Sequence, residues 1–230
     1  MKIYYREKSG GIEILRCFGI ESRVEIPGMI DGKLVISAAP YAFSSHMDEK
    51  EDLKNASLWE VSDGLEFGRE EHVLAGNDVE EIVFPYTLKE IGRYIFYGCG
   101  NLKKLEFSDS LMQIGCGAFT GCHALEKLTV HMRKKSGVKE MLGEMWQRID
   151  VNFLYEYEEA RLVFPEHYDE AVENTPARIL YTEYHGSGSN YRQCFYDKEL
   201  NYQEYDRLFE MAVAMDKLEV LVDMSFGRLE

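Results

Sequence analysis

VEEIVFPYTLKEIGRYIFYGC, residues 79–99, is followed at a constant distance by LKKLEFSDSLMQIGCGAFTGC, residues 102–122. The two segments agree in identity or residue type at eight positions that lie 23 residues apart. The pairs are Val79/Leu102, Ile82/Leu105, Phe84/Phe107, Leu88/Leu111, Ile91/Ile114, Gly92/Gly115, Phe96/Phe119 and Cys99/Cys122. The same offset leads on to Leu125, Leu128 and Val130, which begin a further strand. We therefore expect a solenoid, because a unit this short can bury its apolar face only against the next unit.

An earlier copy of the unit extends over residues 24–46. Its Ile-Pro at 26–27 matches Phe84-Pro85, and its Ala-Phe at 42–43 matches Ala-Phe at 118–119. This copy is longer by a turn at residues 30–33, where Asp-Gly is typical turn chemistry. After Val130 the pattern is expected to stop. Residues 47–78 are predicted to be an irregular insertion, a degenerate repeat with a short strand near 58–61.

These residues resemble the BspA-type leucine-rich repeat, a Leu-x-x-Ile-x-Leu-Pro strand followed by Leu-x-x-Ile-Gly-x-x-Ala-Phe-x-x-Cys. The resemblance covers roughly residues 12–130 and departs from the pattern at Ile95, Ser108 and His46. It implies a curved solenoid with one short strand per coil. Gly92 and Gly115 are predicted at turns that need either a positive φ or a close approach of two backbones.

Alternate residues of each strand point inward to the core and outward to solvent. The outward set is predicted to form a concave face with alternating charges, which suits the binding of a protein or peptide strand. Its members are Arg23, Glu25, Glu81, Val83, Lys104, Glu106, Lys127 and Thr129.

The last third of the chain differs in composition. Residues 151–230 hold 17 acidic and 7 basic residues, so ten of the 15 net negative charges, and they hold nine of the 15 tyrosines. We expect a mixed α/β fold: a leucine-rich-repeat solenoid over residues 1–135 and a capping, small α+β domain over 136–230. Within the second part we predict helices at 138–147, 166–173 and 202–215, and strands at 151–155, 160–164 and 176–181. This part resembles a module of unknown role that follows such repeats in some bacterial proteins.

A Gly/Ser-rich stretch, HGSGSNYR at residues 185–192, is the candidate site of the second part. Its backbone amides and nearby arginines favour an anion-binding nest. The candidate residues are Arg178, His185, Ser187, Asn190, Tyr191 and Arg192. The stretch lacks the phosphate-loop Lys-Ser/Thr and the G-x-S-x-G of hydrolases, so no catalytic residue is assigned. The simpler interpretation of this stretch is a connecting turn.

Cysteines and histidines of the repeats suggest two alternatives. Cys99, Cys116, Cys122, His123 and His131 could ligate zinc, but no C-x2-C pair occurs and two of the cysteines occupy equivalent repeat positions. Buried thiols in a ladder are the preferred interpretation, with no metal and no cofactor. The odd cysteine count of five suits a reducing compartment.

The net charge of −15 argues against nonspecific nucleic-acid binding, which needs cationic side chains for the phosphates. No apolar run of signal-peptide or membrane-spanning length is visible, so a cytoplasmic location without membrane contact is expected. The leading hypothesis is a non-catalytic module that binds a protein or peptide on the concave face. The alternative is a C-terminal domain that binds a small ligand or anion, or acts as an enzyme, through residues 185–192.

Overall fold

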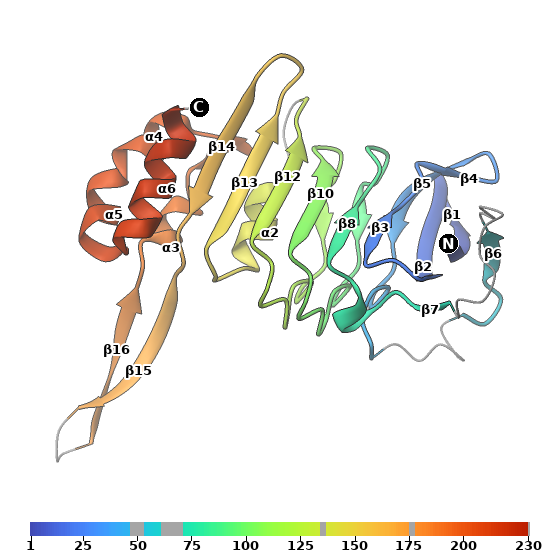
Figure 1. The fold of residues 1–230 in the computed structure, drawn as a ribbon, viewed down its shortest axis with the longest axis horizontal. Coiled ribbons are helices and arrows are strands. Elements are labelled where there is room, and N and C mark those ends of the chain that lie inside the picture. Colours follow the sequence, from blue (N-terminus) through green and yellow to red (C-terminus); the bar gives the residue numbers. More distant parts are fainter. Residues whose placement is uncertain (47–52, 61–70, 134–136, 175–177, 230) are drawn as a thin grey trace.

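Two stacked sheets form the repeat region in the computed structural model, which describes residues 1–46, 53–60, 71–133, 137–174 and 178–229. The first sheet has six strands in the order β14-β13-β12-β10-β8-β3 and lies at the front of Figure 1. From β3 to β13 all neighbours are parallel, as coils of a solenoid require. The bounds are β3 (Arg23–Glu25), β8 (Glu81–Val83), β10 (Lys104–Ser108), β12 (Lys127–His131), β13 (Ile149–Leu154) and β14 (Glu159–Phe164).

The second sheet follows the order β11-β9-β5-β2-β1-β6, with β4 paired to β5 and β7 paired to β2. It holds the second strands of the first three coils, β5, β9 and β11, and the N-terminal hairpin. The bounds are β1 (Lys2–Lys8), β2 (Gly11–Gly19), β4 (Met29–Ile30), β5 (Lys33–Ala38), β6 (Ser57–Glu60), β7 (His72–Val73), β9 (Glu90–Ile91) and β11 (Gln113–Ile114). A 3-10 turn at Gly76–Asp78 precedes β8. The β1–β2 hairpin extends this sheet beyond the first coil.

The insertion at 47–78 is not a degenerate repeat, which corrects the prediction. Strand β3 pairs directly with β8, Arg23 beside Glu81, so no coil lies between them. In the described parts of the insertion, β6 pairs with β1 and β7 with β2. The predicted strand near 58–61 is therefore present as β6, but as an antiparallel edge strand.

The lengthened first copy folds as predicted around an Asp-Gly turn. Asp31 and Gly32 have φ values of 48° and 75° between β4 and β5. Two positive φ values in a two-residue loop define the hairpin turn whose twist matches that of its strands.

The core of the solenoid is a ladder of equivalent side chains. The rings of Phe43, Phe96 and Phe119 stack from coil to coil with centroids 5.8 and 5.4 Å apart. This confirms the register of all three copies. Glycine is needed at positions 92 and 115 because the backbones of adjacent coils approach closely there, and not because φ is positive. A Cβ on Gly115 would lie 2.1 Å from the backbone nitrogen of Arg93.

The repeat register continues beyond Val130, where the sequence pattern was expected to stop. Lys127 pairs with Asp150, again 23 residues on, and Leu128 with Val151. Helix α2 (Val138–Gly143), shorter than the predicted 138–147, occupies the return of this coil. Val138, Met141 and Leu142 are fully buried. The predicted boundary at 135/136 lies within this coil, and β14 then pairs antiparallel to β13.

The rest of the chain forms a projecting hairpin and a small helical layer (Figure 1). The predicted helix at 166–173 is wrong: β15 (Tyr168–Asn174) pairs with β16 (Ile179–His185) over seven residue pairs. Tyr168, Ala171 and Val172 have helical spacing, but the cross-strand pairing prevails. The predicted strand 176–181 begins outside the described residues. The predicted helix at 202–215 is present in two pieces. The remaining bounds are α3 (Gly188–Tyr191), β17 (Phe195–Tyr196), β18 (Glu199–Leu200), α4 (Tyr202–Arg207), α5 (Phe209–Met215) and α6 (Leu218–Leu229).

Candidate functional site

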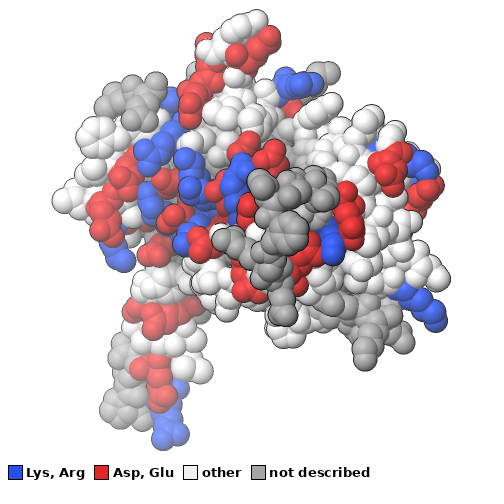
Figure 2. Space-filling model, turned by 45° about the vertical axis from the view of Figure 1, so that its right-hand side comes forward, with Lys and Arg blue, Asp and Glu red and all other residues white. Residues whose placement is uncertain are grey.

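The outward side chains of the six-stranded sheet, called the open face below, form two rows across the strands. One row runs Arg23, Glu81, Lys104, Lys127 and Asp150, and the other runs Glu25, Val83, Glu106, Thr129 and Asn152. All eight residues predicted for the concave face are thus brought side by side, each on the strand expected. Figure 2 shows basic and acidic side chains gathered in alternation over this sheet.

Ion pairs link several charged side chains of the open face to one another or to neighbouring residues. The Arg23 guanidinium donates to Glu25 and Glu81 at 2.9 Å each, and these carboxylates raise its pKa. The His131 ring lies 2.7 Å from the Glu106 carboxylate. Within the described part of the chain, neither Lys104 nor Lys127 forms an ion pair. The middle of the open face therefore presents Lys104 and Lys127 side by side, and the acidic residues that flank them in the row, Glu81 and Asp150, pair with arginines.

One end of the open face is bounded by residues that the sequence reasoning missed. The Asp150 carboxylate forms ion pairs with Arg148 and Arg161, each at 2.8 Å. Arg148 also forms an ion pair with Asp223 of α6 at 2.8 Å. Helix α6 packs against β14, where a Cβ on Gly227 would lie 2.7 Å from the Arg161 carbonyl oxygen. The missed signal was the 23-residue offset, which places Asp150 and Asn152 in register with Lys127 and Thr129.

A two-part groove lies at the carboxyl ends of these parallel strands. Its smaller part, about 360 Å³, extends along Phe84, Tyr86, Glu106 and Ser108–Ser110, and its larger part, about 840 Å³, is bounded by Leu154–Glu158. Both parts share His131 and Arg133. The Arg133 guanidinium lies over the Tyr86 ring, 5.8 Å from its centroid.

The exposed aromatic residues of this groove were not predicted as a site. Tyr86 and Tyr157 are 66% and 88% exposed, and Tyr155 bonds through its hydroxyl to that of Tyr202 at 2.9 Å. Exposed tyrosines beside a cation give large contact area at low entropic cost. The available signal was their position shortly after the carboxyl ends of two strands, β8 for Tyr86 and β13 for Tyr155 and Tyr157.

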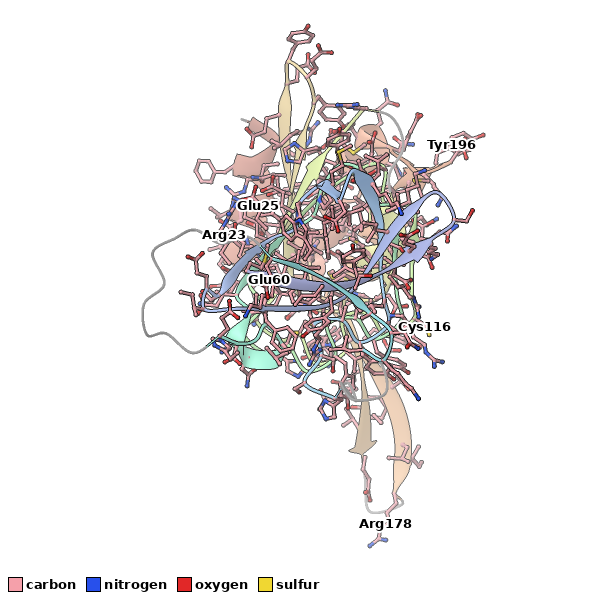
Figure 3. The ribbon with its side chains drawn as sticks, turned by 90° about the vertical axis from the view of Figure 1, so that its right-hand side faces the viewer. Arg23, Glu25, Glu60, Cys116, Arg178 and Tyr196 are labelled. Atoms are coloured by element: carbon pink, nitrogen blue, oxygen red, sulfur yellow. The ribbon has the colours of Figure 1, made fainter. Side chains whose placement is uncertain are left out.

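The residues predicted as an anion site do not converge. Arg178 lies 86% exposed at the far tip of the hairpin, where it pairs with Glu173 (Figure 3). Arg192 is buried, and its donors are directed to the carbonyl oxygens of Leu142, Met145, Gln147, Pro165 and Gly188 at 2.6–3.1 Å. Burial lowers the Arg192 pKa to about 10.

The middle of the same stretch is also structural. Ser187 is fully buried and donates its hydroxyl to Asp216, which also accepts its backbone N–H. Asn190 lies in the one-turn helix α3, and the Tyr191 ring is fully buried 4.7 Å from that of Tyr205. This segment therefore joins the helical layer to the solenoid.

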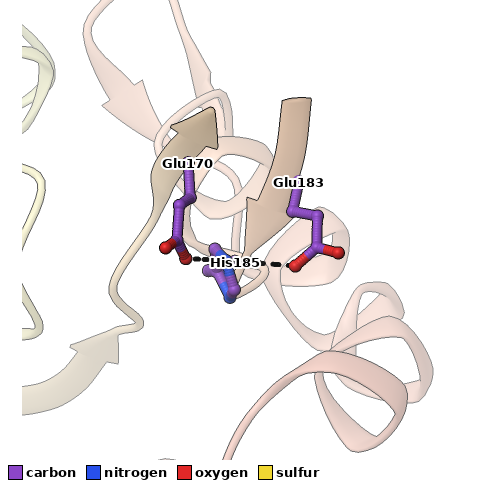
Figure 4. A group of neighbouring side chains, drawn as sticks. All are labelled: Glu170, Glu183 and His185. Atoms are coloured by element: carbon purple, nitrogen blue, oxygen red, sulfur yellow. Dashed lines mark ion pairs between the residues drawn. The ribbon is translucent and has the colours of Figure 1, made fainter. Parts of the chain in front are cut away.

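His185 lies at the base of the hairpin with two glutamates. Its Nε2 is 3.1 Å from Glu170 and 4.0 Å from Glu183. Dashed lines mark these two ion pairs in Figure 4. The sequence reasoning named His185 but neither glutamate, since the hairpin that brings them together was predicted partly as a helix.

Buried thiols occupy the equivalent positions Cys99 and Cys122, as the ladder interpretation predicts. Each donates to the carbonyl oxygen of the preceding coil, Cys99 to Phe43 at 3.3 Å and Cys122 to Phe96 at 3.2 Å. Burial raises the pKa of both, that of Cys99 to about 12. Cys116 is exposed on the side of the solenoid opposite Arg23 and Glu25 (Figure 3).

Thiol reactivity should differ between the exposed Cys116 and the buried cysteines. In the folded protein we expect one rapidly modified thiol, Cys116, because the other four are buried and the thiolate is the nucleophile. Titration with a chromogenic disulfide before and after unfolding in guanidinium measures this, with Cys116→Ser as the control. A rapid second equivalent in the folded protein would contradict the buried ladder.

Among the described residues, the helices are too short or too polar to cross a bilayer.

The family model of the BspA type leucine-rich repeat region matches residues 70–152, with 6 copies. A search of curated proteins finds no match. Among solved structures, the chain is similar to a leucine-rich repeat protein of T. pallidum, with 22% identity and a TM-score of 0.40. That match covers 56% of this chain and 50% of the other, so the chain spans about half the length of that relative. The repeat match coincides with coils β8 to β13, so residues 70–152 of this chain are similar to the BspA-type leucine-rich repeat region.

Proposed function

We propose that the chain is a non-catalytic module that binds a protein or peptide across the open face. Leucine-rich repeats generally mediate protein–protein interaction. The observation that carries the proposal is the pair of side-chain rows across the strands, with Lys104 and Lys127 adjacent in one row and without an ion pair among the described residues.

The charge of these rows points to the chemistry of the partner. Arg23 and Glu81 neutralise each other, whereas Lys104 and Lys127 form no ion pair among the described residues and can attract an incoming carboxylate. Exposed charges of this kind govern partner choice and association rate more than total affinity. An acidic segment laid along the lysine row is therefore the preferred occupant.

The groove beside the rows supplies apolar contact. Tyr86 follows β8, and Tyr155 and Tyr157 follow β13. These two strands flank β10 and β12, which carry Lys104 and Lys127, so one partner segment can use both the groove and the lysines. Aromatic anchors with a charged rim are typical of peptide-binding surfaces. The proposed ligand thus combines acidic residues with at least one aromatic or aliphatic residue.

We also propose that residues 136–230 cap the solenoid. Three features support this: α2 fills the last coil, β14 ends the sheet antiparallel, and α6 covers β14. Terminal capping units are needed because the last coil otherwise exposes an apolar face. We do not extend the proposal to a ligand at residues 185–192, because Arg192 is directed to carbonyl oxygens and Arg178 lies at the hairpin tip.

The test is the charge reversal Lys104→Glu/Lys127→Glu. Peptides selected from a random library on the wild-type chain should bind this variant at least about tenfold more weakly, since two attractive charges become repulsive. Fluorescence anisotropy with labelled peptides measures the affinity, and the effect should shrink at high salt.

The matched control is Lys54→Glu/Lys89→Glu, which changes the net charge equally at two exposed lysines outside the six-stranded sheet. This variant should retain wild-type affinity. Wild-type affinity in both double variants would reject the open face as the binding surface. Equal weakening by both would mean that only the global charge matters, which also rejects it.

A further inference from the structure

The base of the β15–β16 hairpin gathers three potential metal ligands from two strands. The register places Glu170 directly opposite Glu183, and His185 follows two residues later on the same side of β16. Figure 4 shows the two carboxylates on opposite sides of the imidazole. Their ligand atoms all lie within 4.8 Å of one another.

The imidazole is held in place by ring stacking, and its Nε2 atom has no hydrogen bond to any described residue. The His185 ring stacks on Tyr168 with centroids 4.5 Å apart and planes at 14°, and Tyr168 contacts Trp146 edge to face. His185 Nε2 is shielded from solvent and, within the described part of the chain, has no hydrogen-bond partner, although it lies 3.1 Å from Glu170. In a side chain that is 33% exposed, Nε2 thus faces the Glu170 and Glu183 carboxylates at ion-pair distance but without hydrogen-bond geometry.

The glutamate pair is also unfavourable by itself. Like charges directly opposite on two antiparallel strands are destabilising. Among the described residues, the ion pairs of Glu170 and Glu183 are made with His185, while Arg178 pairs with Glu173 toward the other end of the hairpin. A cation between the three groups would remove the repulsion and give the nitrogen a partner.

We propose that Glu170, Glu183 and His185 bind a divalent transition metal, with Zn²⁺ the preferred ion. Imidazole nitrogen and carboxylate oxygen are zinc ligands at about 2.0–2.2 Å, so two ligands of a tetrahedral site lie about 3.4 Å apart. The nitrogen-to-oxygen separations of 3.1 and 4.0 Å lie on either side of that value, so small side-chain rotations suffice. Water completes the coordination, and the ion joins the two strands at the base of the hairpin.

Isothermal titration of the full chain with zinc chloride tests the site. One equivalent should bind to the wild type, and Glu170→Gln, Glu183→Gln and His185→Gln should each weaken binding at least about tenfold. Hydrogen exchange of residues 168–185 should slow on addition of Zn²⁺ in the wild type only. Thermal melting of each variant verifies its folding, and the two glutamine variants at the carboxylates leave the stacking of His185 on Tyr168 in place.

The control is Glu173→Gln, on the same strand but on the other face, which should bind Zn²⁺ as the wild type does. An absence of binding up to about 1 mM Zn²⁺, a free energy near −4 kcal/mol, means a histidine–glutamate ion pair only and overturns the site. Binding that persists in all three variants places the ion elsewhere and overturns it equally.

Discussion

Replacing Arg192 with methionine is expected to lower the free energy of unfolding by about 3–5 kcal/mol. The buried guanidinium donates to five backbone carbonyl oxygens. Methionine fills similar volume but donates nothing. The Met145, Gln147 and Pro165 carbonyl oxygens then lose this donor, whereas those of Leu142 and Gly188 keep a backbone N–H. A buried acceptor left unsatisfied costs about 1–3 kcal/mol, which outweighs the recovered cost of burying the charge.

The position of these carbonyls explains why one side chain has so large an effect. Leu142, Met145 and Gln147 belong to the last coil, Pro165 follows β14, and Gly188 begins α3. Arg192 therefore ties three segments of the cap together. Its loss should separate the unfolding of the C-terminal part from that of the solenoid.

Urea unfolding followed by circular dichroism measures the change, and Arg207→Met is the control. Arg207 pairs with Glu204 on an exposed helix surface, where solvent screens the charges, so its replacement should leave the stability nearly unchanged. Equal stability of the two variants would show that the carbonyl contacts of Arg192 contribute nothing.

Gly115→Ala is expected to cost about 3 kcal/mol or more, the upper range for overpacking. The added Cβ would lie 2.1 Å from the Arg93 nitrogen and 2.4 Å from the Gly92 carbonyl carbon. Both atoms are backbone, so no side chain can rotate away. Adjacent coils must instead move apart, which weakens the Gly115 N–H to Ile91 carbonyl bond of 2.9 Å.

Gly143→Ala provides the matched control, because no atom lies within 4 Å of its Cβ position and its φ is not positive. This variant should match or slightly exceed the wild-type stability. Thermal unfolding of both variants decides the matter. A Gly115→Ala protein as stable as Gly143→Ala would mean that the coils are not packed as closely as described.

The repeat register was predictable because solenoid contacts are made between nearest neighbours. The 23-residue offset alone places Lys104 beside Lys127 and Phe96 beside Phe119, and the structure has both. The alternation of strand residues then assigned eight of the ten residues in the two rows of the open face. Local periodicity sufficed since each pair is separated by one repeat.

The coil from β12 to β13 was missed because its return lacks the Gly-x-x-Ala-Phe pattern and uses α2 instead. The strand residues Val151 and Phe153 keep the register, but a short apolar strand carries too little pattern to be recognised alone. The hairpin strand at 168–174 was missed for a related reason. The helical spacing of its apolar residues is only a local preference. The hydrogen-bonded pairing with residues 179–185 makes the segment a strand instead.

The sequence by itself determined the solenoid, its period, the inward ladder and the outward rows, because all of these repeat along the chain. Only the tertiary structure decided the role of the residues that do not repeat. Arg192 donates hydrogen bonds to three segments and does not bind an anion. His185 pairs with two glutamates and does not lie near Arg178. These contacts link residues 2 to about 50 positions apart, and no periodicity specifies which of the available partners a buried charge or ring will meet.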